Sequence, residues 1–206
     1  MSKPLFVHVP NNVVRDGNLS SIDFCVFMRL LFLLFITNSK DTIEVDIAKF
    51  KRVLNINDNR TLKSSIERLR KLGYICNNVK FNRRSTSSVV INMNKIDLKN
   101  NFTRLPTSIF KYIADIGHPG VRLLFYYESY INRKDSLRLY CYPSNETIKA
   151  ETKLSNRSII EYNKRLVKSK LLKMTQHDPE PEYDDIGELS WNRWNNHYDV
   201  RLENLL

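Results

Sequence analysis

Along the first half of this chain, apolar residues recur every three or four positions in some segments and every second position in others. These two spacings predict its helices and strands. An extended segment, Val7–Pro10, precedes an almost unbroken apolar run over residues 22–36. This run is expected to form a helix, because Ser20 or Ser21 can cap it and Asp23 lies in its first turn. Downstream the pattern predicts, in order, a strand over 42–45, a helix over 47–54, a turn over 55–58 and a helix over 59–72.

The helix over 59–72 is amphipathic. Leu62, Ile66 and Leu69 recur at a spacing of four and three residues, so they form one inward stripe. The opposite face is polar and mostly basic, with Arg60, Thr61, Lys63, Ser64, Glu67, Arg68 and Lys71. Gly73 then suits a left-handed cap. The β-rich runs that follow predict a hairpin with a basic tip, with strands over 74–81 and 89–93 and a connection over 82–88.

The second half of the chain repeats the first. Phe6-Val7-His8-Val9-Pro10 matches Phe102-Thr103-Arg104-Leu105-Pro106 at an offset of 96 residues. Asn59-Arg60-Thr61-Leu62 matches Asn156-Arg157-Ser158-Ile159 at an offset of 97. Two matches so far apart indicate an internal duplication. We therefore expect two domains, 1–96 and 97–206, each large enough to build a modest core.

The second unit has the same predicted plan with some differences. The expected elements are a helix over 121–130, a strand over 137–142, a helix from Pro143 with Ser144 as its cap, a turn over 154–156, a helix over 157–170, and hairpin strands over 171–174 and 196–202. Asn163 occupies the inward position that Ile66 holds in the first unit. Either this amide is hydrogen-bonded inside the protein, or the helix is rotated.

A helix, a short strand, a helix, a turn, a second helix and a basic hairpin follow one another in the order of a winged helix. The pattern thus predicts an α+β fold, mainly α, with two tandem winged-helix domains, each a helix-turn-helix followed by a β-hairpin wing. The apolar helix over 22–36 allows two interpretations: it is buried in the core, or its outer face also packs against a second subunit. Its 15 residues, interrupted by Asp23 and Arg29, are too few to cross a bilayer.

Charge is unevenly distributed along the chain. Lys and Arg outnumber Asp and Glu by 33 to 22, a net charge of +11. The segment 177–188 holds six acids and no Lys or Arg, so the remainder carries +17. Such an excess favours polyanionic partners, either nucleic acid or an anionic membrane surface. The acidic segment is expected to be a solvated loop, with shielding of the DNA surface as the alternative.

The sequence offers little chemistry beyond binding. Cys25, Cys76 and Cys141 are scattered and the four histidines are isolated from one another, so neither a metal site nor a disulfide framework is expected. With five glycines and no phosphate-binding loop or nucleophile elbow, we expect no enzyme activity, no cofactor and no small-molecule substrate. A signal peptide is not evident and no membrane association is expected, so the chain is assigned to a reducing cytoplasm.

The candidate DNA contacts lie on and just before the predicted helices over 59–72 and 157–170, and on the predicted hairpin of the first unit. An Asn side chain can bond adenine bidentately and an Arg side chain guanine, while helix N-termini and Lys side chains suit phosphates. The predicted contacts are Asn59, Arg60, Thr61, Lys63, Ser64, Glu67, Arg68, Lys80, Arg83, Arg84, Ser155, Asn156, Arg157, Ser158, Glu161 and Lys164. Taken singly, an exposed Lys or Arg residue among them is commonly just part of a solvated helix face. Their repetition in both units is what favours DNA.

The second unit resembles the winged-helix domains of plasmid and phage replication proteins, and primosomal DnaD-type N-terminal domains are similar. The resemblance rests on the segments Phe102–Pro106, Tyr142–Ile148 and Leu154–Ile159, with Asn196–Val200 as the last wing strand. It implies a sequence-specific double-stranded DNA-binding protein of a mobile genetic element, acting at an origin or operator as replication initiator or transcription regulator. An accessory protein at a transfer origin is a close variant.

A protein-interaction scaffold, such as a helicase loader, is the alternative from another class. Winged helices also pair with one another and with other proteins, and the apolar helix over 22–36 together with Trp191 and Trp194 could supply such a surface. The partners expected are therefore double-stranded DNA and either a second copy of the chain or a replication or transfer protein.

Overall fold

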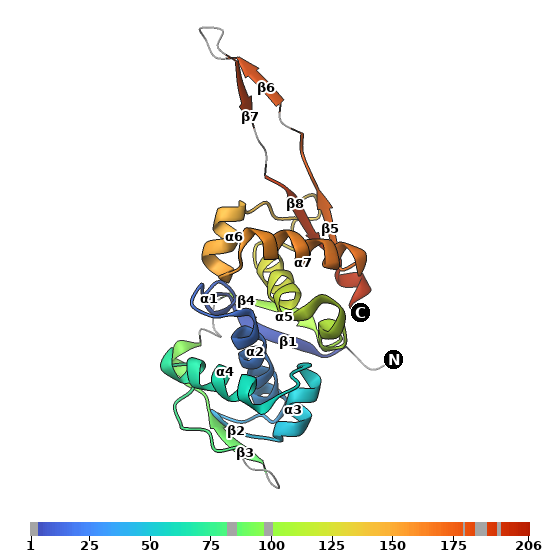
Figure 1. Cartoon of the computed structure of the whole chain (residues 1–206). Coiled ribbons are helices and arrows are strands. Elements are labelled where there is room, and N and C mark those ends of the chain that lie inside the picture. Colours follow the sequence, from blue (N-terminus) through green and yellow to red (C-terminus); the bar gives the residue numbers. More distant parts are fainter. Residues whose placement is uncertain (1–3, 82–85, 97–100, 179, 184–188, 193–194) are drawn as a thin grey trace.

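The protein is a mixed α+β structure, mainly helical, with small antiparallel sheets (Figure 1). The computed structural model describes residues 4–81, 86–96, 101–178, 180–183, 189–192 and 195–206. The first half comprises β1 (Phe6–Pro10), α1 (Asn11–Val14), α2 (Ser21–Ile36), β2 (Thr42–Val45), α3 (Ile47–Val53), α4 (Asn59–Lys71), β3 (Ser87–Val90) and a 3-10 turn (Met93–Lys95). The second comprises β4 (Phe102–Pro106), α5 (Ile109–Glu128), α6 (Asn145–Thr152), α7 (Asn156–Lys168), β5 (Leu172–Thr175), β6 (Glu180–Tyr183), β7 (Leu189–Asn192), β8 (His197–Val200) and a 3-10 turn (Leu202–Asn204).

The long apolar run is a buried helix, which confirms the first of its two interpretations. Ser20 caps α2 by accepting a hydrogen bond from the Asp23 amide, and most of the helix is buried. It packs against β1, α4 and α5, so it has neighbours on several sides and is apolar almost all round. Only its last turn emerges, where Phe35 and Ile36 are exposed. No helix in the described part of the chain has the length and apolar character that a bilayer crossing requires.

The two halves are joined by a shared sheet and a shared core. β1 and β4 pair antiparallel, with Phe6 opposite Pro106 and Pro10 opposite Phe102. The central pair, His8 and Arg104, consists of equivalent positions of the internal repeat. A two-fold axis through this pair therefore exchanges the two strands. The buried apolar residues form one continuous cluster that includes both halves, rather than two separate cores.

The seam between the halves has close polar and backbone contacts. Arg122, on α5, is fully buried and donates from Nη2 to the carbonyl oxygens of Asp16 (2.9 Å) and Glu151 (3.0 Å), one in each half. Burial lowers the pKa of Arg122 to about 10. At Gly17, a β-carbon would lie 2.0 Å from the carbonyl oxygen of Ala150, so only glycine permits this approach. The halves are thus held in one fixed relation.

Most predicted elements of the first half are confirmed, but its hairpin is not. β3 pairs with β2, whereas residues 74–81 contribute only a single bridge between Ile75 and Ile91. The Asn77 side chain replaces part of the expected ladder, because it donates to the Ser88 carbonyl (3.0 Å) and accepts from the Val90 amide (2.9 Å). Residues 82–85 of the predicted tip lie outside the described residues.

The second half departs from prediction at three places. α5 begins at Ile109 rather than near 121, and it bends at Gly117, which has a φ of 66°. The predicted strand over 137–142 is wrong, since only Cys141 forms a bridge, to Tyr198, and Leu137 is 89% exposed. The acidic segment is not simply a loop, because β6 lies within it and pairs with β7. The predicted strands around β5 and β8 are confirmed.

Candidate nucleic-acid interface

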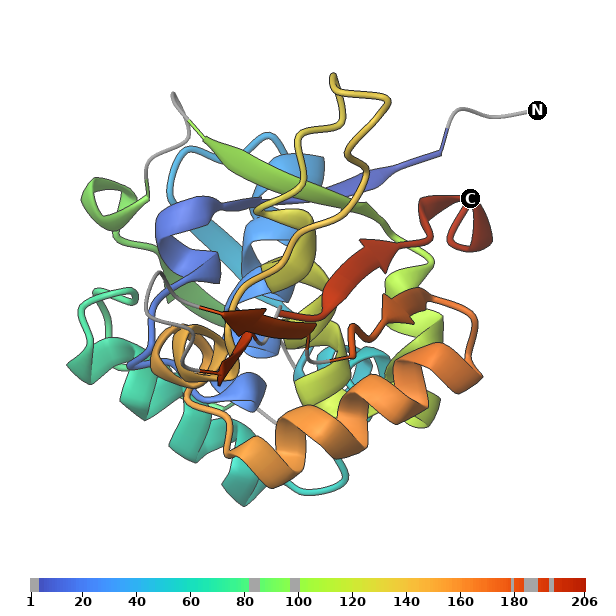
Figure 2. The same ribbon diagram turned by 90° about the horizontal axis from the view of Figure 1, so that it is seen from above.

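α4 and α7 are equivalent helices of equal length on one side of the molecule. Each has 13 residues and begins after an N-cap side chain, Asp58 for α4 and Ser155 for α7. Both lie on the front in Figure 1 and along the lower edge in Figure 2, whereas the β1–β4 ribbon lies on the opposite side. In Figure 1 α4 runs from right to left and α7 from left to right, so the two helices are opposed in direction, as β1 and β4 are.

A short helix precedes each of these helices, α3 before α4 and α6 before α7, and a tight turn joins the two members of each pair. Asp46 caps α3 by accepting from the Lys49 amide (3.0 Å), and Ser144 caps α6 by accepting from the Thr147 amide (3.1 Å). Asn55, after α3, and Lys153, after α6, both adopt positive φ, of 52° and 60°. A left-handed residue ends the first helix in each half, so the chain turns directly into α4 or α7.

The first turn of α4 presents free polar groups to solvent. Asn59 and Arg60 are exposed, and the Arg60 guanidinium forms no ion pair within the described part of the chain. Thr61 is half-buried and donates to both carboxylate oxygens of Asp58, from its amide and its hydroxyl, at 2.7 Å each. These bonds lower the pKa of Asp58, first through the Thr61 amide. The bonds between Asp58 and Thr61 cap the start of α4, and the side chains of Asn59 and Arg60 remain exposed to solvent.

The middle of α4 contains two kinds of charged residue. Lys63 and Ser64 are exposed, and the Lys63 ammonium lies 5.4 Å from the centre of the Phe81 ring. Glu67 is engaged in an ion pair with Arg70, at 2.7 Å. Lys63 therefore points toward the segment that ends at Phe81, while the charge of Glu67 is balanced within the helix.

Arg68 lies on the exposed side of α4 but is tied to the protein. It donates from Nε and Nη2 to the two oxygens of Asp23 on α2, at 2.9 and 2.7 Å. Asp23 is 1% exposed and also accepts from the Ser20 hydroxyl. Burial alone would raise the pKa of Asp23, but hydrogen bonds from Arg68 and Ser20 lower it below its ordinary value. Arg68 thus attaches α4 to α2, a role that the sequence-based assignment to DNA did not include.

The first turn of α7 matches that of α4. Asn156 and Arg157 are exposed, and the side chain of Arg157 forms no ion pair with another described residue. Ser155 and Ser158 hydrogen-bond through their hydroxyls, at 2.9 Å, as part of the cap. The structure therefore brings Asn59 with Arg60 and Asn156 with Arg157 to equivalent, open positions.

Farther along α7, one charged residue is free and one is paired. Lys164 is exposed without an ion pair in the described structure, whereas Glu161 binds Arg165 at 2.6 Å. Arg165 is the equivalent of Arg68, but it binds this exposed neighbour instead of a buried acid. Asn163 is buried, and its Oδ1 accepts from the Tyr127 hydroxyl at 2.9 Å. The first interpretation of Asn163, a hydrogen bond inside the protein, is confirmed.

The segment predicted to form the first wing is described only in part. Lys80 is exposed, while Arg83 and Arg84 lie outside the described residues. At the start of β3, the Thr86 hydroxyl donates to Glu44 at 2.7 Å, which joins the returning strand to β2. Among the described residues, no three His, Cys, Asp or Glu side chains form a cluster able to hold a metal ion.

Two residues that sequence reasoning did not assign prove important for the geometry of this face. Asp23 anchors α4, and Arg122 joins the halves that carry α4 and α7. Each is a charged residue within a mainly apolar stretch of helix, a signal that was visible in the sequence. No protein-family model matches the chain, and no match was found among curated proteins.

Proposed function

We propose that this protein is a tandem winged-helix protein that binds double-stranded DNA at a specific site of a mobile genetic element. In this proposal α4 and α7 are the recognition helices, and the segments around β2–β3 and β5–β8 are the wings. The observation that carries the proposal is the pair of open helix starts, Asn59-Arg60 and Asn156-Arg157, on one side of the molecule. Their donors match the base edges of a major groove, and one helix fits each groove.

The two-fold relation of the halves supports a particular form of DNA site. Symmetric recognition helices read half-sites in opposite orientation, about one helical turn, roughly 10 base pairs, apart. Because α4 and α7 differ in sequence after their first turns, the half-sites should be similar only in part. The shared core and the β1–β4 pairing should also make binding sensitive to the half-site spacing.

The biological role of the protein depends on where its DNA target sequence lies in the mobile element. A protein of this kind marks an origin in replication, an operator in transcription, or a transfer origin as an accessory factor. Selection of bound fragments from random duplex DNA, followed by location of the selected sequence near an origin or promoter, distinguishes these roles. No catalytic step is proposed.

We expect Arg60→Ala and Arg157→Ala each to weaken binding to the selected site by roughly tenfold or more, because each removes a bidentate base contact worth about 1–3 kcal/mol. Binding to random duplex should change much less. Arg70→Ala is the matched control, since this arginine lies on α4 but is paired with Glu67. Fluorescence anisotropy with both duplexes measures the effect.

Equal loss in all three variants would contradict the assignment of the recognition helices. A wild-type protein with no preference for any sequence, at any salt concentration, would instead favour the interaction scaffold. Specific binding should also weaken steeply as salt rises, because phosphate contacts release counterions.

A further inference from the structure

The hydrogen bonds between β1 and β4 show which backbone groups of β4 are already used. At one end of the ladder the Thr107 amide donates to the Leu5 carbonyl, and at the other end the Asn11 amide donates to the Asn101 carbonyl, both at 2.9 Å. Both pairs continue the register of the two strands. Bonded and non-bonded pairs alternate along an antiparallel ladder, so positions 101, 103, 105 and 107 bond to β1 and the positions between them do not.

The amides and carbonyls of Phe102 and Arg104 therefore point away from β1, toward the outer edge of β4. β1 is the only strand that pairs with β4 in the described structure, so this outer edge is open. Unpaired amides and carbonyls along a strand edge are a template on which a further strand can form. β4 thus offers backbone hydrogen bonds to an extended peptide.

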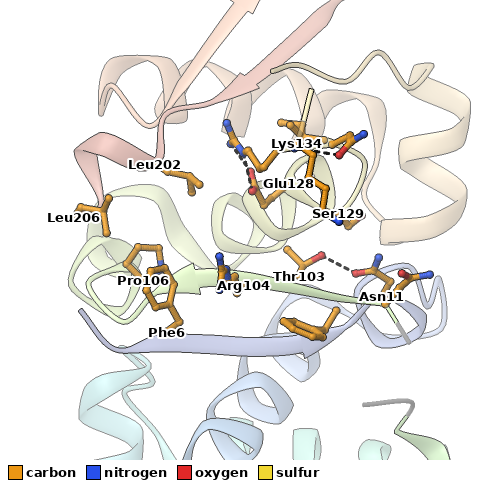
Figure 3. A pocket seen from close by; sticks show the side chains of 15 residues that line it. Phe6, Asn11, Thr103, Arg104, Pro106, Glu128, Ser129, Lys134, Leu202 and Leu206 are labelled. Carbon is orange, nitrogen blue, oxygen red and sulfur yellow. Dashed lines mark hydrogen bonds and ion pairs between the residues drawn. The ribbon is translucent and has the colours of Figure 1, made fainter. Parts of the chain in front are cut away.

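A groove runs along this edge of β4. It has a volume of about 750 Å³ and lies between β4, the end of α5 and residues 202–206 (Figure 3). Part of its lining is exposed apolar surface, since Phe102 is 45% exposed and Leu206 is 72% exposed. A cleft of this volume is within the range of ligand sites in proteins. The open edge of β4 therefore borders a space that an extended segment can enter.

The groove has an excess of positive charge. Glu128 is held by Arg133, with Nε–Oε1 and Nη2–Oε2 distances of 2.9 and 2.5 Å, so these two charges balance. Arg104 and Lys134 are exposed and form no salt bridge with another described residue. Figure 3 shows these two residues on opposite walls of the groove, Arg104 on β4 and Lys134 beyond α5. Charge complementarity therefore favours an acidic occupant.

The position of Arg104 also argues against a second copy of β4 as the occupant. Arg104 is the central residue of β4, so two copies paired antiparallel about this position would place two arginines directly opposite one another. Phe102 and Pro106 lie two residues to either side of Arg104 and share its face, because side chains alternate along a strand. A complementary strand has an acid opposite Arg104 and apolar residues two positions before and after that acid. This pattern is the same in either strand direction.

We propose that the groove binds an extended acidic segment of a partner protein, which adds a third strand to the β1–β4 sheet. The peptide backbone pairs with Phe102 and Arg104, and its acid lies between the charges of Arg104 and Lys134. In Figure 2 the β1–β4 ribbon lies on the side opposite α4 and α7, so a peptide bound here leaves the proposed DNA face open.

An NMR titration of the isotope-labelled full-length chain with a short peptide tests this proposal. The peptide has seven residues, with glutamate in the centre, valine two positions to either side of it and threonine elsewhere. On binding, hydrogen exchange of the Phe102 and Arg104 amides should slow, whereas the Thr103 and Leu105 amides, which already bond to β1, should change much less. A peptide with lysine in place of the glutamate should bind at least about tenfold more weakly.

Charge reversal in the groove should reverse this preference. Arg104→Glu with Lys134→Glu is expected to bind the lysine peptide more tightly than the glutamate peptide. If this variant does not give the spectrum of a folded protein, Arg104→Gln with Lys134→Gln takes its place and should bind both peptides alike. Arg52→Glu with Lys71→Glu is the matched control, since it makes the same change in net charge at exposed residues outside the groove and should keep the wild-type preference.

Three results would overturn the proposal. The first is that neither peptide binds the wild type, or that the glutamate peptide binds without protecting the Phe102 and Arg104 amides. The second is that these amides become protected without peptide as the protein concentration rises, which would mean that a second copy covers the edge. The third is that an oligothymidine strand protects them more strongly than the glutamate peptide does, which would make the groove a nucleic-acid site.

Discussion

The two halves of this protein fix equivalent helices to the core in chemically different ways. In the first half an ion pair joins α4 to α2, between Arg68 and the buried carboxylate of Asp23. In the second half a neutral hydrogen bond joins α7 to α5, between Asn163 and the hydroxyl of Tyr127. Equivalent helices are thus attached to the core by two different interactions, and the residues that form these interactions are not at equivalent positions of the repeat.

The difference follows from what each central helix provides. α2 is apolar apart from a few residues, so a single acid in its first turn can attract an arginine from α4. α5 instead contributes Tyr127, whose ring stacks on Tyr198 with a centroid separation of 4.3 Å and whose hydroxyl reaches α7. Arg165 is then free to pair along its own helix, with Glu161. Equivalent arginines are therefore expected to contribute very differently to stability.

The largest expected effect comes from removing these equivalent arginines one at a time. Arg68→Ala leaves the buried Asp23 carboxylate without its cation, and we expect a loss of about 2–3 kcal/mol in the free energy of unfolding, somewhat below the range for fully buried pairs. Arg165→Ala removes only an exposed pair within a helix, worth under about 0.5 kcal/mol. Urea denaturation at pH 7 measures both. Similar losses would mean that the two halves are anchored alike.

A smaller effect is expected at the neutral anchor. Asn163→Leu leaves the buried Tyr127 hydroxyl without its acceptor, and we expect a cost of about 1–3 kcal/mol. Adding Tyr127→Phe should restore part of this loss, because both polar groups are then absent while the ring still stacks on Tyr198. A double-mutant cycle from the four unfolding free energies gives the coupling. Additive losses would show that this hydrogen bond does not join α7 to the core.

The local elements were readable from the sequence because their signals are local. The helix start at Ser20 and the inward stripe of α4, with Leu62, Ile66 and Leu69, each depend on a few neighbouring residues, and the structure confirms them. The strand predicted over residues 137–142 was wrong, because an alternating pattern does not by itself provide a strand to pair with. In this segment only Cys141 forms a bridge, to Tyr198. Likewise β3 pairs with β2 across more than 40 residues, which no local pattern specifies.

For the candidate site, composition could suggest which side chains face outward but not which of them are engaged. Arg60 and Arg68 look alike in the helix pattern, yet one is open and the other is held by Asp23 from a helix 45 residues away in sequence. The fixed relation of α4 to α7 was also beyond the pattern, since it depends on the β1–β4 register and on Arg122. Contacts distant in sequence decide both.

The smallest expected effect uses pH to separate the two anchors. Hydrogen bonds from Arg68 and Ser20 overcome the effect of burial and lower the pKa of Asp23 in the folded protein below its ordinary 3.8, so the ionised carboxylate contributes stability above that pH and loses it in more acid solution. In Arg68→Ala, burial should raise this pKa instead, so Asp23 is protonated before the wild-type group is. The destabilisation by Arg68→Ala should therefore shrink between pH 7 and pH 3.

The neutral anchor supplies the comparison, because neither Tyr127 nor Asn163 changes its proton count in that range. Burial raises the pKa of the Tyr127 hydroxyl well above its ordinary value, so it stays protonated throughout. The loss caused by Asn163→Leu should then be the same at pH 7 and pH 3, measured by urea denaturation at both. If the Arg68→Ala loss were equally constant, Asp23 would not be the ionised partner that holds α4, and the contrast between the halves would rest on packing alone.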